Sequence, residues 1–190
     1  IMEESEYQGV RLSLDAYLDR TRIPLKIDIS TGDVITPCEI SFSYQLMFEN
    51  RTIPLLAYPP ETVLAEKLET ILSRGEANTR LRDFYDVYIL QREDFVVTPD
   101  ALCHALLATC RKRGHEDLLH TYASILDRVR QSDTMRTQWM KYQSDFDYAA
   151  GITWDTVLDT VETLCMKTLD DHAFGDELPQ EKSQFEMHLL

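Results

Sequence analysis

The stretch that decides the fold, residues 58–86, is YPPETVLAEKLETILSRGEANTRLRDFYD. Proline in a first helical turn followed by glutamate is a helix start. Apolar residues then recur at three- and four-residue spacing as far as Arg74, and Gly75 is a helix stop. After a short loop, a second helix is predicted from about Thr79 to Gln91. The stretch therefore predicts two consecutive helices joined by a short basic loop.

The residues before this stretch have the pattern of β-strands. Apolar and polar residues alternate in Val10–Leu14 and more clearly in Leu25–Ile29, which is typical of strands with one buried face. Residues 31–33, Thr-Gly-Asp, supply a turn. Two further short strands are predicted at Glu39–Leu46 and Thr52–Ala57. The first 57 residues are therefore predicted to form β-sheet.

The residues after the stretch predict more helices and an acidic tail. Thr98 begins a third helix that ends near Gly114. Three more are expected at about residues 116–130, 135–143 and 153–169. After Asp170 the sequence is acidic and lacks periodicity, which predicts a frayed tail. We therefore predict an α+β fold with three parts: sheet over residues 1–57, a helical domain over 58–170 and the tail over 171–190.

Composition and charge narrow the function classes. The net charge is −14, and residues 145–190, with eleven acidic and two basic residues, carry −9 of it. Such a chain is not a non-specific nucleic-acid binder, so any phosphate ligand needs a local basic cluster. No apolar run reaches the roughly 18 residues of a membrane span. The acidic N-terminus is not a signal peptide.

The cysteine pattern indicates a reducing compartment. The four cysteines are not spaced as C-x-x-C and lie among apolar neighbours: Cys38, Cys103, Cys110 and Cys165. Free thiols in the cytoplasm are the expected reading. With five scattered histidines, the sequence shows no zinc site.

A basic cluster lies in and after the first predicted helix. Lys67 falls within the apolar stripe of that helix, where an ammonium group is costly unless it reaches a partner, a ligand or water. Arg74, Arg80 and Arg82 follow within sixteen residues. Arginine binds phosphate oxygens in a bidentate manner, so this cluster is a candidate phosphate clamp. The alternative is a solvated loop whose arginines pair with nearby acids.

Carboxylates could meet this cluster from two sides. On the strand Leu25–Ile29, Lys26 and Asp28 share the polar face, and a carboxylate on a sheet is a common metal ligand in phosphoryl transfer. Taken alone, this strand is better explained as an ordinary amphipathic strand with a solvated outer face. On the second helix, Asp83 and Asp86 lie three residues apart and can point at one site, although Asp86 could simply pair with an arginine four residues earlier.

Together these segments resemble a known family. KIDI at residues 26–29, YPPETVLAEKL at 58–68 and NTRLRDFYDVY at 78–88 resemble the later motifs of the AbiEii/AbiGii toxin nucleotidyltransferases. The preceding YQGVR at residues 7–11 and the Gly32-Asp33 turn are similar as well. The resemblance covers roughly residues 5–95, and beyond them only a generic helical bundle is expected.

The resemblance implies a nucleotidyltransferase-like mixed sheet followed by a mostly helical domain. It implies Mg²⁺-dependent transfer of a nucleotide from an NTP to an RNA, for example a tRNA, or to a protein. Such toxins act in type IV toxin–antitoxin or phage-defence systems, with a cognate antitoxin as a partner. By position, Asp28 matches the sheet carboxylate, Lys67 the lysine that holds triphosphate, and Asp83 the first aspartate of the R-D-x-Y-D block, preceded by Arg82.

One motif of the family is absent from these residues. The family's first motif is Gly-Ser followed by paired carboxylates, and this sequence has no Gly-Ser pair. Its comparable D-x-D, Asp145-Phe146-Asp147, comes after the helices and is better explained as a solvated loop. We therefore expect weak NTP binding and little or no transfer from the 190 residues alone. The alternatives are a metal-dependent nuclease using Asp28 and Lys67, and a non-catalytic module that binds a basic partner.

Overall fold

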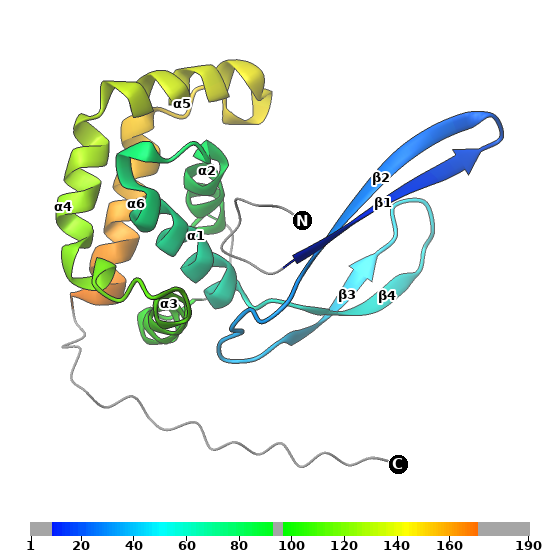
Figure 1. Cartoon of the computed structure of the whole chain (residues 1–190), viewed down its shortest axis with the longest axis horizontal. Helices are drawn as coiled ribbons and strands as arrows, with labels where there is room; N and C mark the ends of the chain where they lie inside the picture. Colours follow the sequence, from blue (N-terminus) through cyan, green and yellow to red (C-terminus); the bar gives the residue numbers. More distant parts are fainter. Residues whose placement is uncertain (1–8, 93–96, 171–190) are drawn as a thin grey trace, which may run out of the picture.

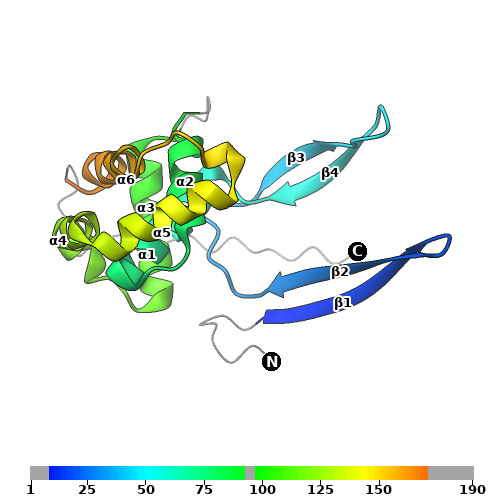
Figure 2. The ribbon, with the colours of Figure 1, turned by 90° about the horizontal axis from the view of Figure 1, so that it is seen from above.

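The computed structural model describes residues 9–92 and 97–170. Helices pack together on one side of the molecule, and two β-hairpins extend from the other side (Figure 1). Seen from above, the hairpins run in a similar direction without merging (Figure 2). The predicted α+β class is confirmed, and the change from strands to helices falls between Ala57 and Pro60. The predicted tail over residues 171–190 lies outside the described residues.

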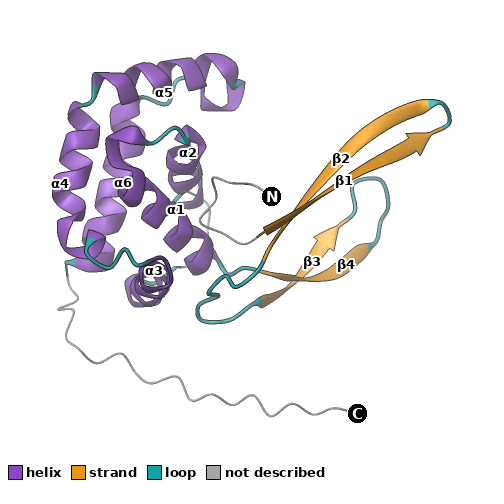
Figure 3. Cartoon of the chain, viewed as in Figure 1, coloured by secondary structure: helices purple, strands orange, loops and turns teal. Residues whose placement is uncertain are grey.

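The strands form two separate antiparallel pairs (Figure 3). β1 (Gly9–Leu18) pairs with β2 (Thr21–Ser30), and β3 (Ile40–Gln45) pairs with β4 (Thr52–Ala57). Within the described residues no strand joins the two pairs, so the expected single mixed sheet is not formed by these strands. Each pairing is local, because strands that follow one another through a short turn meet at the lowest loop-closure cost.

The first hairpin is longer than the sequence pattern predicted. The predicted strands Val10–Leu14 and Leu25–Ile29 both continue inward to a two-residue turn at Asp19-Arg20. Asp19 has a φ of 52°, in the left-handed region that aspartate tolerates better than most residues. No glycine marks this turn, which is why the sequence did not reveal it.

After the strands, the described residues form six α-helices and two 3-10 turns. Their bounds are α1 (Pro60–Arg74), η1 (Gly75–Ala77), α2 (Leu81–Leu90), α3 (Pro99–Arg113), α4 (Leu118–Gln131), α5 (Asp133–Asp145), η2 (Asp147–Ala149) and α6 (Trp154–Leu169). All six predicted helices are present, with ends shifted by a few residues. None of the helices in the described part of the chain is long and apolar enough to cross a membrane.

The helix ends follow local signals in the sequence. The Thr98 hydroxyl accepts a hydrogen bond from the Ala101 amide at the start of α3, and Thr153 does the same for Thr156 in α6. Gly114 ends α3 with a φ of 70°, the left-handed conformation that favours glycine. These ends fix where each helix presents its apolar face.

One apolar core lies among the helices. Leu64, Leu68 and Ile71 of α1 pack with Phe84 of α2, and all are buried. Trp139 of α5 is also fully buried. As expected from the two apolar stripes, α1 and α2 are neighbours in this core, with Leu81 buried and Tyr85 and Tyr88 partly buried against it. The core fixes the positions of α1 and α2, and therefore of their polar faces.

Candidate active site

Lys67 joins the polar faces of α1 and α2. Its Nζ lies 3.2 Å from Asp83 Oδ1 and 2.6 Å from Asp86 Oδ2. Arg80 Nε lies 3.1 Å from the other oxygen of Asp83. Asp83 is only 3% exposed, which is tolerable for a carboxylate because two cations contact it. Asp86 is thus held mainly by Lys67, since Arg82 lies at 3.7 Å.

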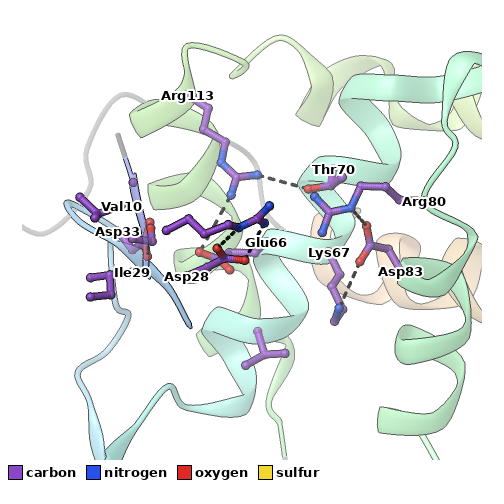
Figure 4. A pocket seen from close by; sticks show the side chains of 14 residues that line it. Val10, Asp28, Ile29, Asp33, Glu66, Lys67, Thr70, Arg80, Asp83 and Arg113 are labelled. Carbon is purple, nitrogen blue, oxygen red and sulfur yellow. Dashed lines mark hydrogen bonds and ion pairs between the residues drawn. The ribbon is translucent and has the colours of Figure 1, made fainter. Parts of the chain in front are cut away.

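This cluster forms one wall of a cavity of about 370 Å³ between the first hairpin and the helices. Figure 4 shows Lys67 and Arg80 directed toward Asp83 on the α1–α2 side, with Asp28 on the hairpin side. The three residues predicted to share a site, Asp28, Lys67 and Asp83, therefore line one cavity. The complete lining is Gly9, Val10, Arg11, Asp28, Ile29, Ser30, Asp33, Val63, Glu66, Lys67, Thr70, Arg80, Asp83 and Arg113.

Asp28 is held by Arg11 on the opposite strand. The two residues are register partners in the hairpin, and Arg11 Nε and Nη2 donate to the two carboxylate oxygens at 2.5 and 2.8 Å. These hydrogen bonds lower the pKa of Asp28. Both oxygens of the carboxylate proposed as a metal ligand are therefore already used by a guanidinium group. A metal role for Asp28 stays a prediction.

Asp33 ties the hairpin to the start of α1. Its Oδ2 accepts hydrogen bonds from Ser30 Oγ at 2.8 Å and from the Tyr58 hydroxyl at 2.7 Å. The hydrogen bond to Asp33 raises the pKa of Tyr58 to about 12, with burial as the second cause. The tyrosine that precedes the two prolines thus anchors the edge of the cavity, a role that the sequence pattern did not show.

A buried glutamate brings an arginine from α3 to the cavity. Glu69 is 1% exposed and accepts from Arg113 Nη1 and pairs with His115 Nδ1 at 2.6 Å. Arg113 also lies 3.9 Å from Glu66 and 3.4 Å from the Thr70 hydroxyl. Sequence reasoning missed Arg113, Glu66 and Glu69, because the partners are more than 40 residues apart and no local pattern links them.

The cavity is formally balanced in charge. Four cations, Arg11, Lys67, Arg80 and Arg113, face four carboxylates, Asp28, Asp33, Glu66 and Asp83. Burial, followed by the charge of Asp33, raises the pKa of Glu66. The cations and carboxylates thus lie in interleaved pairs, and an entering phosphate would compete with carboxylates for the cations.

The carboxylates do not converge as a metal site. Among residues 9–92 and 97–170, no group of three or more histidine, cysteine, aspartate or glutamate side chains is placed to hold a metal ion. The oxygens of Asp28 and Asp83 instead face guanidinium and ammonium groups. As placed, both carboxylates are paired with cations, which a magnesium ion would have to displace.

Some predicted site residues lie elsewhere. Arg74 lines a separate cavity at the C-terminal end of α1, because seven residues carry the helix about 10 Å further along its axis. Lys26 does not line the cavity, although its positive charge contributes to lowering the pKa of Asp28. Arg82 lines a second cavity, to which Lys67 also contributes. The predicted four-residue clamp is therefore reduced to Lys67 and Arg80 at this site.

Comparison with known proteins identifies a family. The family model of the nucleotidyl transferase AbiEii toxin, type IV toxin–antitoxin system, matches residues 1–160, well over half of the chain. Neither a curated protein nor a solved structure was found that matches the chain. The matched residues include both hairpins, α1, α2 and every residue that lines the cavity.

Proposed function

The chain belongs to the nucleotidyl transferase AbiEii toxin family of type IV toxin–antitoxin systems, and we propose that it supplies the triphosphate-binding part of a nucleotidyltransferase site. The observation that carries the proposal is the convergence of Lys67 and Arg80 on the buried Asp83 at the cavity wall. Lysine and arginine are the side chains that bind phosphate oxygens most strongly. Family membership also implies an antitoxin as a partner.

The chemistry assigns a role to each of these side chains. In nucleotidyl transfer, an acceptor hydroxyl oxygen bonds to the α-phosphorus of the NTP while the bond from that phosphorus to the bridging oxygen breaks, and the hydroxyl proton passes to water. Pyrophosphate leaves with increased negative charge, so cations fixed beside it stabilise the transition state. Lys67 and Arg80 take this role, and Asp83 holds both cations in place. Asp28, on the opposite wall, is the predicted sheet carboxylate of the site.

The wider setting follows from the family. The acceptor classes that the resemblance implies are an RNA, such as a tRNA, and a protein, and the biological role is that of a toxin in phage defence. The four free thiols favour the cytoplasm as the compartment. Because the described residues lack a metal-binding group of carboxylates, binding of the NTP is the property that this chain is best suited to show.

The test is NTP binding by the 190-residue chain with two matched pairs of variants. Lys67→Met removes one cation from the cavity wall, whereas Lys167→Met removes an exposed lysine of α6. Arg80→Ala and Arg74→Ala compare an arginine at the cavity with one outside it. Since a hydrogen bond to a charged group contributes about 1.5–3 kcal/mol, Lys67→Met and Arg80→Ala should each weaken binding about tenfold or more.

Equilibrium dialysis with labelled NTPs measures these affinities. The two control variants should bind as the unmodified chain does. Equal affinity across all five proteins would refute the assigned triphosphate site, and so would a larger loss in Arg74→Ala than in Arg80→Ala.

A further inference from the structure

The first cavity receives cations on two flanks of α1. One stripe of α1 lines it, at positions i, i+3, i+4 and i+7: Val63, Glu66, Lys67 and Thr70. On the flank that faces α2, Lys67 is held by Asp83. On the flank that faces α3, Arg113 reaches the cavity from the last position of that helix. A ligand in the cavity therefore meets cations carried by α1 and by α3.

The C-terminal end of α3 determines where Arg113 lies. Gly114 follows it with a φ of 70°, and the amides of Gly114 and His115 donate hydrogen bonds to carbonyl groups in the last turn of α3. These two hydrogen bonds form a Schellman motif, which needs the left-handed conformation that glycine adopts without strain. Past this turn, His115 contacts the same residue of α1 as Arg113 does, namely Glu69.

Glu69 holds Arg113 in the way that Asp83 holds Lys67. Glu69 is buried and accepts a hydrogen bond from Arg113 Nη1, while its other oxygen lies 2.6 Å from His115 Nδ1. Asp83 is buried as well and contacts Lys67. A buried ion pair seldom stabilises a fold more than apolar packing would, so stability alone does not explain the Glu69–Arg113 pair. In both places a buried carboxylate fixes a cation at the cavity wall.

The contacts of Arg113 inside the cavity are weaker than its contact with Glu69. Its Nη2 lies 3.9 Å from Glu66 Oε1, longer than a hydrogen bond, and its Nη1 lies 3.4 Å from the Thr70 hydroxyl oxygen (Figure 4). Burial, followed by the charge of Asp33, raises the pKa of Glu66, so the charged form of this carboxyl is disfavoured where it lies. A phosphate oxygen can therefore take the place of Glu66 beside Arg113.

We propose that Arg113 is a third phosphate-binding residue of the site, beside Lys67 and Arg80, and that Glu69 is the residue that positions it. When a nucleotide binds, a phosphate oxygen replaces Glu66 as the partner of Arg113 Nη2, while Glu69 keeps its contact with Nη1. Because Glu69 already fixes the side chain, binding requires little further ordering of it. The inference rests on the proposed function and extends the site to α3.

NTP binding by variants of Arg113 tests its contact with phosphate. Equilibrium dialysis of the full chain with labelled NTPs at pH 8 gives the affinities. Arg113→Gln should weaken binding about tenfold or more, the loss expected for one hydrogen bond to a charged group. Arg113→Lys keeps the charge without the planar fork and should retain part of the affinity. The matched control is Arg111→Gln, at an exposed arginine of the same helix that pairs with Glu116, and it should bind as the unmodified chain does.

The positioning role of Glu69 is tested by a double-mutant cycle. Glu69→Gln should weaken NTP binding about two- to tenfold in the otherwise unmodified chain. It should have no further effect in the Arg113→Gln chain, because Glu69 acts on the nucleotide only through Arg113. A purely structural role would lower the affinity by the same factor in both chains, and that outcome would overturn the positioning role.

Glu66→Gln should change the affinity in the opposite direction. It removes the carboxylate that competes with phosphate for Arg113, so NTP binding should strengthen about two- to fivefold. The gain should be smaller in the Arg113→Gln chain. General damage to the cavity cannot strengthen binding, so this variant decides the question even if Arg113→Gln folds poorly. Unchanged or weaker binding by Glu66→Gln would contradict the exchange of Glu66 for phosphate.

Lys67→Met and Arg113→Gln together separate this inference from the proposed function. Affinity that depends on Lys67 and is indifferent to Arg113 would overturn the inference and leave the triphosphate site in place. Affinity that is indifferent to both residues, or an unmodified chain that does not bind NTPs, would refute the triphosphate site and the inference with it.

Discussion

The helices and the hairpins differ in how far their apolar side chains are exposed to solvent. In the helical part, Leu64, Leu68, Phe84 and Trp139 are at most 1% exposed. In the hairpins, every residue of β2 and β3 is exposed, including Ile27 and Phe42. Isolated two-stranded hairpins are at best marginally stable, whereas a buried core stabilises its helices. The comparison teaches that the helical side carries the stability and the hairpin side contributes one wall of the site.

The largest effect should come from the helical core. Phe84→Ala removes a fully buried ring whose centroid lies 5.1 Å from that of Trp154, and should lower the free energy of unfolding by about 3–5 kcal/mol. Phe42→Ala, in β3, should cost less than about 1 kcal/mol because the ring is already 49% exposed. Urea unfolding followed by circular dichroism measures both. Equal losses would abolish the contrast between the two regions.

The next effect concerns ion pairs. Glu69→Leu leaves Arg113, whose side chain is 11% exposed, without its main partner, and should cost about 3 kcal/mol. The double variant Glu69→Leu with Arg113→Leu should recover part of this loss. In the second hairpin, Glu49→Gln breaks an exposed pair with Arg51 and should change stability by less than about 0.5 kcal/mol. A larger change in Glu49→Gln than in Glu69→Leu would reverse the comparison.

Alkaline pH should weaken the helical core to a smaller extent. Burial raises the pKa of Cys110 and Cys165 from 9.0 to about 12. The unfolded chain then loses these protons before the folded chain does, so stability is complete below pH 9 and falls as the pH rises toward 12. Between pH 9 and 10 the loss should be about 1 kcal/mol per cysteine.

Urea titrations at pH 8, 9 and 10 measure the slope of the free energy of unfolding against pH. Cys110→Ala should flatten it, whereas Cys38→Ala, at an exposed thiol before β3, should leave it unchanged. A slope that does not depend on Cys110 would show that burial of this thiol does not control stability at high pH.

The smallest effect is expected on the hairpin surface. Leu56→Ser in β4 changes a residue that is 75% exposed, so the free energy of unfolding should stay within about 0.5 kcal/mol of its original value. The same measurement on Leu64→Ser, at a buried position of α1, should show a loss several times larger. Destabilisation by Leu56→Ser of more than about 1 kcal/mol would mean that the hairpin face is covered in solution.

Local sequence signals determined the helices and the side of the site that α1 and α2 form. Pro60, Thr98, Gly114 and Thr153 act on neighbouring backbone groups, so helix ends could be predicted without knowledge of the fold. The meeting of Lys67 with α2 was also predictable, because two apolar stripes joined by a short loop pack side by side and bring their adjacent polar residues together. The extent of β1 and β2 was missed because their turn at Asp19 lacks a glycine.

Only the tertiary structure decided which distant side chains complete the site. Arg113 reaches the cavity because α3 packs on α1 and because Glu69, 44 residues earlier, holds it. Arg11 neutralises Asp28 through the register of the hairpin, and Arg74 is excluded by its distance along α1. Periodicity tells which face of a helix is buried, but not which element covers it. That choice depends on the shape and charge of the whole core, because each packing contact restricts the positions open to the others.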